Sequence, residues 1–216
     1  MKIKWLGHSS FLITSRAGVS ILTDPYKSGS YEGAVGYGKI TDAADIVLVS
    51  HDHDDHNSVE SVPGSPVVLK GPGEHESKGI KFRGVETYHD KSQGKERGKN
   101  TVFVFDVDGV KVCHLGDLGH TVGKETCSKI GKVDVLLVPV GGFFTIDAAE
   151  ATAVAEALDP RIVIPMHFKT EKLGFPIAGV DGFLKGKQSV KRQGSAEIEL
   201  AGVEGERQIV VLDHAL

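Results

Sequence analysis

The chain has 216 residues, 40% hydrophobic and 25% charged, which suits one sizeable globular domain spanning residues 1–216. Its formal net charge of -4 provides no basic field and disfavours broad binding of nucleic acid. No apolar run approaches the ~20 residues that cross a bilayer, and the first residues lack the apolar stretch of a signal peptide. We therefore expect a cytoplasmic protein without membrane insertion, whose two cysteines, Cys113 and Cys127, stay reduced.

The first forty-five residues or so predict an antiparallel meander followed by a loop. Short β-rich runs occupy residues 2–6, 11–13 and 19–22. The last run leads to Asp24, which could orient a ligand histidine from behind or be an ordinary turn residue. Residues 27–39 are rich in glycine and predict a surface loop or a mobile flap. A short helical turn is expected at residues 42–44.

Six consecutive residues, all histidine or aspartate, follow the buried strand predicted at residues 46–50. They are His51, Asp52, His53, Asp54, Asp55 and His56. Imidazole and carboxylate together suit a divalent cation such as zinc. His51 and His53 can face one side of an extended segment, while Asp55 and His56 can reach an adjacent position. The spacing predicts two ions, and a solvated acidic loop is the alternative.

The rest of the chain alternates further strands with few helices. Strands are predicted over residues 67–69, 80–88, 101–107, 110–115, 133–140, 162–164, 196–200 and 208–212, and helices beginning near residues 58, 148 and 180. The pair Asp108-Gly109 predicts a tight hairpin, and Asp147 is expected to cap the longest helix. We interpret His75 as a loop residue. This pattern predicts two packed sheets with helices outside.

Four predicted strands end in candidate ligands, and such strand ends meet at one sheet edge. The expected arrangement is one zinc site made by His51, His53 and His89, a second made by Asp55, His56 and His167, and Asp117 bridging the two. Individually, His89 and His167 could also be ordinary buried histidines. His114 precedes Asp117 by an odd number of residues and is expected to pack in the core.

These residues resemble the metallo-β-lactamase superfamily. The motif HxHxDH is matched at residues 51–56, and the single ligands follow in the family's order. The stretches at residues 7–10, 23–25, 114–117 and 164–167 extend the likeness, which is greatest to the branch of ascorbate 6-phosphate lactonase and the phospholipase D acting on N-acyl phosphatidylethanolamine. The resemblance implies an α/β fold, a four-layer αββα sandwich of two mixed sheets, two metal ions and hydrolysis. It does not imply β-lactam cleavage.

We therefore expect a binuclear metal-dependent hydrolase in which a hydroxide shared by two divalent ions attacks a small ester, lactone or phosphodiester. Zn²⁺ is the expected ion, with Mn²⁺, Ni²⁺ or Fe as alternatives. Asp117 would set the separation of the ions, and His120 would donate the leaving-group proton or bind an anion. His8 and Lys169 are candidate substrate contacts.

The expected partner is a small-molecule substrate that could be anionic, because the loop at residues 91–99 carries four basic side chains. The chain could also form a homo-oligomer. Two alternatives remain: a nuclease acting on RNA or DNA, which would need a basic groove, and a metal-binding sensor or regulatory protein without turnover.

Overall fold

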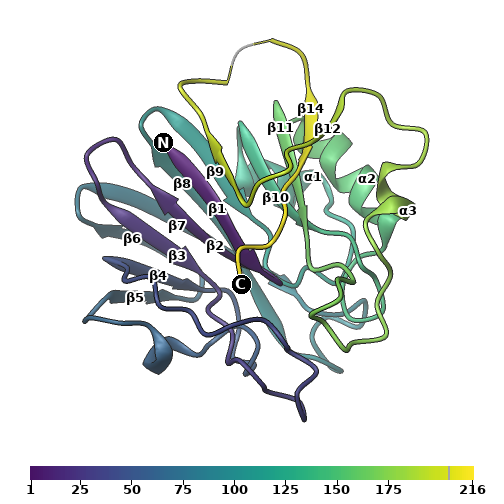
Figure 1. Cartoon of the computed structure of the whole chain (residues 1–216). Helices are drawn as coiled ribbons and strands as arrows, with labels where there is room; N and C mark the ends of the chain where they lie inside the picture. The colour runs from purple at the N-terminus through teal and green to yellow at the C-terminus, as the bar shows by residue number, and fades with distance from the viewer. Residues whose placement is uncertain (204) are drawn as a thin grey trace.

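The computed structural model describes residues 1–203 and 205–216, and its strands form two sheets that face each other (Figure 1). The six-stranded sheet consists, in spatial order, of β13 (Glu197–Glu199), β1 (Lys2–Gly7), β2 (Ser10–Thr14), β3 (Ser20–Thr23), β4 (Ile46–Val49) and β5 (Val67–Lys70). Strands β1, β2 and β3 form the predicted antiparallel meander, and β13 pairs with β1 in antiparallel fashion, whereas β3, β4 and β5 run parallel. The sheet is therefore mixed.

The eight-stranded sheet is mixed as well. In spatial order it contains β12 (Val190–Arg192), β14 (Gln208–Val211), β11 (Ile162–Met166), β10 (Val135–Pro139), β9 (Val110–His114), β8 (Lys99–Val107), β7 (Ile80–Tyr88) and β6 (Gly73–Ser77). Strands β6 to β9 are antiparallel, and β9, β10, β11, β14 and β12 are parallel. The predicted turn at Asp108-Gly109 joins β8 to β9, with φ of 57° and 82°.

The main core lies between the two sheets. Trp5 and Phe11 from the first sheet and Phe103 and Val112 from the second belong to one buried apolar cluster. Because β10 and β11 are buried along their whole length, their sequences are continuous apolar runs with no polar alternation. The confronting apolar faces explain why the two sheets stay together.

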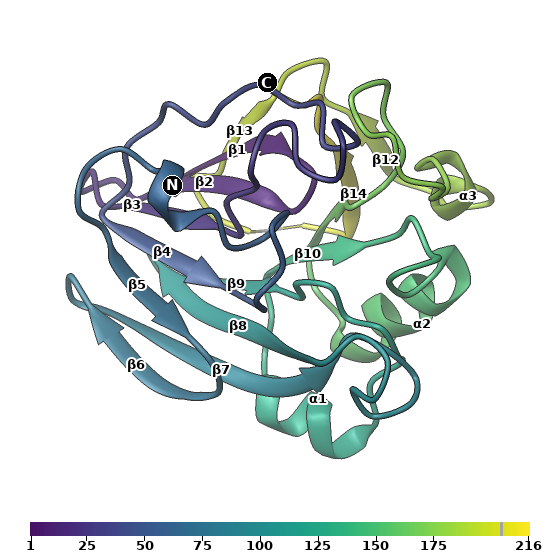
Figure 2. The same ribbon diagram turned by 90° about the horizontal axis from the view of Figure 1, so that it is seen from below.

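In the described part of the chain, three α-helices lie beside the eight-stranded sheet (Figure 2): α1 (Lys124–Ile130), α2 (Ala148–Leu158) and α3 (Asp181–Leu184). The cap expected for α2 is confirmed, because the Asp147 carboxylate accepts the backbone N–H groups of Ala149 and Glu150. Its buried face is apolar at helical spacing, as the sequence predicted. Within the described ranges, 1–203 and 205–216, no helix is long and apolar enough to cross a membrane.

The outer face of the six-stranded sheet is covered by irregular chain instead of an α-helix. Val47 and Val49 of β4 pack with Tyr26, Val35 and Tyr37 in a second apolar cluster. The 3-10 helix η1 (Val59–Ser61) lies after the hexapeptide, where the sequence predicted a short helix. The predicted sandwich of two mixed sheets is thus confirmed, and extended loops supply much of its fourth layer.

Several predicted elements are wrong. Residues 42–44 form no helical turn, and the side chain of Asp42 instead pairs with Lys4 Nζ at 3.0 Å. His75 lies in the edge strand β6, paired with β7, and not in a loop. The strands β6 and β12 and the helix α1 were not predicted, because they are short and mostly exposed and so have little apolar periodicity.

Candidate metal centre

The candidate ligands follow the carboxyl ends of strands from both sheets. The hexapeptide follows β4 in the six-stranded sheet, and His89, Asp117 and His167 follow β7, β9 and β11 in the other. Strands β7, β9 and β11 run in one direction, because β8 is antiparallel to both its neighbours and β10 is parallel to both of its own. Their ends therefore meet the hexapeptide at one edge of the sandwich (Figure 2).

Asp117 is the centre of this convergence. Its Oδ2 atom lies 3.2 Å from Nε2 of His56, 3.2 Å from Nε2 of His89 and 3.3 Å from Nε2 of His167. Nε2 of His51 is 3.9 Å from the same oxygen. One carboxylate thus faces four imidazoles from three separate segments of the chain.

Three sets of side chains are close enough to share a cation. They are His51, His53 and His89; His8, Asp55, His56 and His167; and His51, His56 and Asp117, with one ligand atom from each residue within 4.8 Å of the others in its set. The structure brings together all seven residues that the sequence predicted as ligands, in the predicted grouping. His8 joins the second set, which the sequence did not predict.

Several ligand atoms in these sets lack a partner. Nε2 of His51, Nε2 of His56 and Oδ1 of Asp117 are buried and make no hydrogen bond to the described part of the protein. A buried polar atom without a partner costs about 1–3 kcal/mol, so such atoms are rarely left unsatisfied. Imidazole nitrogens and a carboxylate oxygen gathered in this way fit a divalent cation.

A second layer of contacts orients the imidazoles. Oδ2 of Asp24 lies 3.0 Å from Nδ1 of His56 and accepts the hydroxyl proton of Ser50 at 2.7 Å. Since the Ser50 proton is used there, Nδ1 of His51 donates to Ser50 Oγ at 2.9 Å. His51 therefore carries its proton on Nδ1 and turns its Nε2 lone pair inward, while the contact with Asp24 fixes a proton on Nδ1 of His56 and leaves its Nε2 facing the centre. This is the orienting role that the sequence left open for Asp24.

The backbone near the centre adopts unusual conformations. His8, Asp24 and His167 have φ of 52°, 39° and 48°, a region in which residues other than glycine are uncommon. Gly116 has φ of 55°, and a Cβ atom there would lie 2.4 Å from Asn100 Oδ1. Since Asn100 Oδ1 accepts the N–H of Asp117 at 3.0 Å, only glycine lets the chain turn this closely before Asp117.

Burial and neighbouring charges shift the pKa values in a direction that suits cation binding. Burial alone would raise the pKa of Asp117, but the adjacent His167 and His56 hold it well below its usual range. Burial, helped by His56, lowers the pKa of His51 well below its usual value. An anionic carboxylate and a neutral imidazole are the forms that bind a metal. His56 differs: despite burial, Asp117 and Asp55 raise its pKa, so it would release a proton on binding.

Comparison with known proteins now identifies the family. Residues 2–167 match the model of the beta-lactamase superfamily domain. The chain belongs to this superfamily. A metal-dependent hydrolase of Thermococcus onnurineus is 31% identical over 195 residues, which cover 79% of this chain and 85% of that protein.

Solved structures agree with this membership. A candidate Zn-dependent hydrolase of the metallo-β-lactamase superfamily from Thermotoga maritima has 42% sequence identity and a TM-score of 0.80, covering 98% of this chain and 97% of its own. The short form of human tRNase Z has 12% identity and a TM-score of 0.56, covering 79% of this chain and 93% of its own, so the likeness extends to the fold alone. The resemblance to the metallo-β-lactamase superfamily that the sequence indicated is confirmed.

The two candidate substrate contacts, His8 and Lys169, are absent from the lining of the cavity described below and make other contacts. His8 is fully buried beside the candidate metal centre. Its Nε2 lies 3.0 Å from Asp55 Oδ2, and its ring centre lies 4.3 Å from that of His167. Burial, followed by repulsion from His167, lowers the pKa of His8 to about 4. Lys169 donates to the backbone oxygen of Phe175 at 2.8 Å. His8 therefore contacts the candidate ligand Asp55, and Lys169 contacts the backbone beside the cavity described below.

The other two uncertain histidines are bonded to the backbone. Nε2 of His120 accepts the N–H of Tyr88 at 3.2 Å, and Nδ1 donates to the oxygen of Thr121 at 2.8 Å. His114 is buried, and its Nε2 donates to Ser9 O at 2.9 Å, in agreement with its predicted core position. Among the residues that the structure describes, neither histidine belongs to a candidate metal set.

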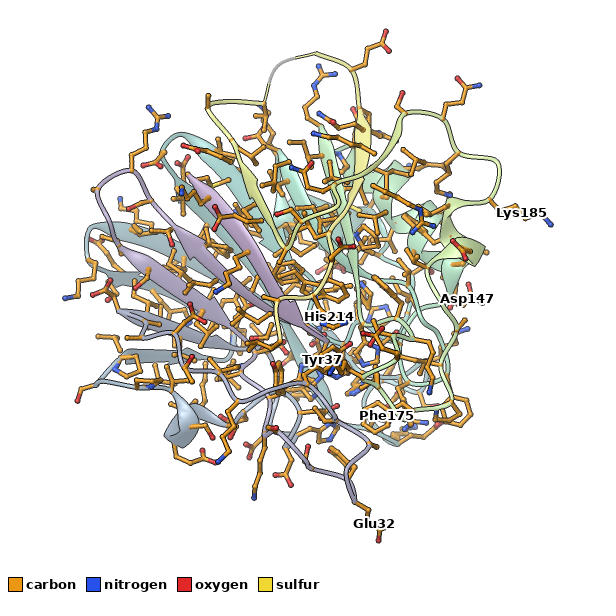
Figure 3. The ribbon with its side chains drawn as sticks, in the orientation of Figure 1. Glu32, Tyr37, Asp147, Phe175, Lys185 and His214 are labelled. Atoms are coloured by element: carbon orange, nitrogen blue, oxygen red, sulfur yellow. The ribbon has the colours of Figure 1, made fainter. Side chains whose placement is uncertain are left out.

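A cavity of about 350 Å³ adjoins the centre. Its lining residues are Tyr31, His53, Asp55, His89, Arg97, Asp117, Phe144, His167 and Phe175. Figure 3 shows Phe175 on the same lower side of the molecule as the loop tip at Glu32. Sequence reasoning missed Tyr31, Phe144 and Phe175. The only signal was aromatic residues within otherwise glycine-rich, non-core segments.

Proposed function

We propose that the protein is a binuclear metal-dependent hydrolase of a small ester, lactone or phosphodiester. The observation that carries the proposal is the convergence of buried, unpartnered ligand atoms around Asp117, beside a cavity. Metal-dependent hydrolysis is the activity that the names of the relatives state. The volume of the cavity, about 350 Å³, suits a small substrate.

The ligand sets suggest how two ions would be held. His51, His53 and His89 would hold one, and Asp55, His56 and His167 the other, with Asp117 between them. Bound divalent ions at such a site supply Lewis-acid polarisation and a nucleophilic water near neutral pH. The mixture of imidazole and carboxylate favours Zn²⁺ over Mg²⁺ or Ca²⁺, and Mn²⁺, Ni²⁺ and Fe also accept it.

The protein's own side chains would position the substrate and manage its protons. The hydroxyl of Tyr31 donates to Asp55 Oδ1 at 3.2 Å and lies in the cavity wall. It could donate instead to a developing negative charge on the substrate. Because both ring nitrogens of His120 already bond the backbone, Tyr31 is better placed than His120 to contact a leaving group. The apolar rings of Phe144 and Phe175 line the same space and would reduce its contact with water.

The two alternatives have less support. A nuclease would need a long basic groove, and the chain carries a net charge of -4. A sensor without turnover would need no open cavity at its metal centre, whereas here five members of the ligand sets line one.

An activity screen tests the proposal. The metal-loaded protein is assayed against panels of phosphodiesters, lactones and carboxylic esters, with Asp117→Ala as the blank and with metal content measured in parallel. We expect two ions per chain and hydrolysis in at least one panel by the wild type alone. Equal rates for the wild type and the blank in every panel would refute a hydrolase.

A further inference from the structure

The loop after His89 carries four basic side chains, and the structure separates them. Lys91 Nζ pairs with Glu150 at 2.5 Å, and Lys99 Nζ pairs with Glu86 at 2.8 Å. Lys95 is exposed, and it lines neither the 350 Å³ cavity at the metal centre nor the adjacent groove beside His51. Arg97 lines both. Of the four basic side chains, Arg97 alone lines the cavity that adjoins the candidate metal centre.

Arg97 lies at a junction of two spaces. The 350 Å³ cavity contains the ligand sets, and a second groove of about 500 Å³ contains His51, Lys70 and Lys99. His53 and Arg97 are the two residues that line both. Across residues 1–203 and 205–216, no carboxylate lies within ion-pair distance of the Arg97 guanidinium. A half-buried guanidinium without a carboxylate partner is available to an anion.

The position of Arg97 is set by its own loop. The Asp90 carboxylate accepts four backbone N–H groups, from Ser92 at 2.7 Å, Gly94 at 2.8 Å, Glu96 at 3.0 Å and Arg97 at 2.8 Å. The N–H of His89 also donates to the oxygen of Gly98 at 3.0 Å. These bonds tie the loop to the candidate ligand His89, so the Arg97 backbone is ordered before any substrate arrives.

The Arg97 side chain continues an aromatic wall. Its guanidinium carbon lies 4.8 Å from the centre of the Phe144 ring. The Phe144 ring is 5.5 Å from that of Phe175, which is 5.4 Å from that of Tyr31. Tyr31, Phe175 and Phe144 thus form an aromatic wall. It extends from the Tyr31 hydroxyl, which donates to Asp55, to the guanidinium of Arg97. This contact with the face of Phe144 restrains the guanidinium and uses none of its N–H donors.

We infer that Arg97 binds an anionic group of the substrate, a phosphate or a carboxylate, while an apolar part of the substrate packs on the aromatic wall. The inference rests on the proposed function, because it places the reacting bond at the metal centre. A guanidinium can bind either anion through two parallel hydrogen bonds, which a lysine cannot reproduce. The substrate class is therefore a small anionic ester, lactone or phosphodiester with an apolar substituent.

Calorimetric titration of the metal-loaded protein tests this. The probes are phenylphosphonate, benzoate and the neutral benzamide, and the proteins are wild type, Arg97→Gln, Arg97→Lys and Lys95→Gln. We expect Arg97→Gln to weaken binding of one or both anions about ten- to hundred-fold and to leave benzamide unchanged. The affinity of Arg97→Lys for the anions should lie between those of the wild type and Arg97→Gln. Lys95→Gln, which removes the same charge from the same loop, should bind the anions like the wild type. The preferred probe distinguishes phosphate from carboxylate.

Equal anion binding by Arg97→Gln and Lys95→Gln would overturn the inference. Steady-state kinetics on a charged and a neutral ester provide the second readout: Arg97→Gln should raise KM for the charged ester alone, and equal effects on both would also overturn it. If the wild type hydrolyses nothing while anion binding still depends on Arg97, the anion site stands and the proposed hydrolase fails. The two ideas are thus separable.

Discussion

The two halves of the candidate metal centre are built differently. The inner group consists of His8, Asp55, His56 and His167, and the outer group of His51, His53 and His89. His8 and His56 of the inner group are fully buried and line neither cavity, whereas every member of the outer group lines the cavity or the neighbouring groove.

The support behind the two groups differs as well. In the inner group, Asp24 bonds His56 directly, and both His8 and Tyr31 bond Asp55. In the outer group, Asp24 reaches His51 only through Ser50. A ligand that is rigidly oriented loses less entropy on binding a metal. We therefore expect the inner ion to bind more tightly and the outer ion to be the one that meets substrate.

Replacing the shared carboxylate should have the largest effect. Asp117→Ala removes the oxygen that faces imidazoles of both groups, so both ions should be weakened. Hydrolysis should fall by more than about 100-fold, the upper limit for residues that merely orient ligands. Metal content and rate are measured together. If Asp117→Ala loses one ion and keeps the other at full affinity, Asp117 does not contact both ions.

The turn before Asp117 should be the next most sensitive position. In Gly116→Ala the new Cβ would lie 2.6 Å from Cβ of Ser50, at a φ of 55°. The free energy of unfolding should drop by about 1–3 kcal/mol, measured by denaturant titration. Gly109→Ala is the matched control, because its φ of 82° is also positive but its surroundings are open. If Gly116→Ala and Gly109→Ala lose the same unfolding free energy, the close contact with Ser50 does not contribute to the loss.

Changes behind the imidazoles test the difference between the groups directly. Asp24→Asn weakens the contact to His56, and Ser50→Ala removes the one to His51. Titration with a chelator should show the inner ion weakened about 10- to 100-fold in Asp24→Asn, and the outer ion weakened, by less, in Ser50→Ala. If both variants lose the same ion, the distinction between inner and outer groups is wrong.

Tyr31→Phe should have a smaller effect that is confined to the reaction. It keeps the ring against Phe175 and removes the hydroxyl that bonds Asp55. We expect kcat to fall about tenfold, corresponding to one hydrogen bond, with the affinity for both ions nearly unchanged. An unchanged kcat together with a weakened inner ion would mean that the hydroxyl serves the ligand and not the substrate.

The smallest effect is expected at the opposite end of β4 from the hexapeptide. Asp45 accepts the N–H and hydroxyl of Ser20, each at 2.9 Å, and these bonds lower its pKa. The stabilisation is therefore complete above the unfolded pKa of about 3.9 and is lost as the pH falls through the lower folded value.

Denaturant titrations of wild type and Asp45→Ala at several pH values measure this contribution. The difference in unfolding free energy should be under about 1 kcal/mol at pH 7, because the side chain is partly exposed. It should shrink below about pH 4. A difference that grows on acidification would have the wrong sign for a carboxylate with a lowered pKa.

Local patterns in the sequence determined much of the fold and of the ligand set. The meander, the Asp108-Gly109 hairpin and the Asp147 cap depend on neighbouring residues, so they could be predicted. The hexapeptide, with single ligands after three later strands, predicted which side chains meet, because strand direction brings such ends to one edge. Short exposed elements such as β6 and α1 escaped prediction, since little apolar surface is buried there.

Only the tertiary structure decided what each remaining group does. His8 contacts Asp55, 47 positions away, and Tyr31 contacts the same carboxylate across 24 positions. The bonding of both His120 nitrogens and the placing of Arg97 over Phe144 likewise depend on loops from different strands. Residue type and spacing set the chemistry of a ligand cluster, but they carry no information on which loop lies across from it. That depends on the packing of the two sheets.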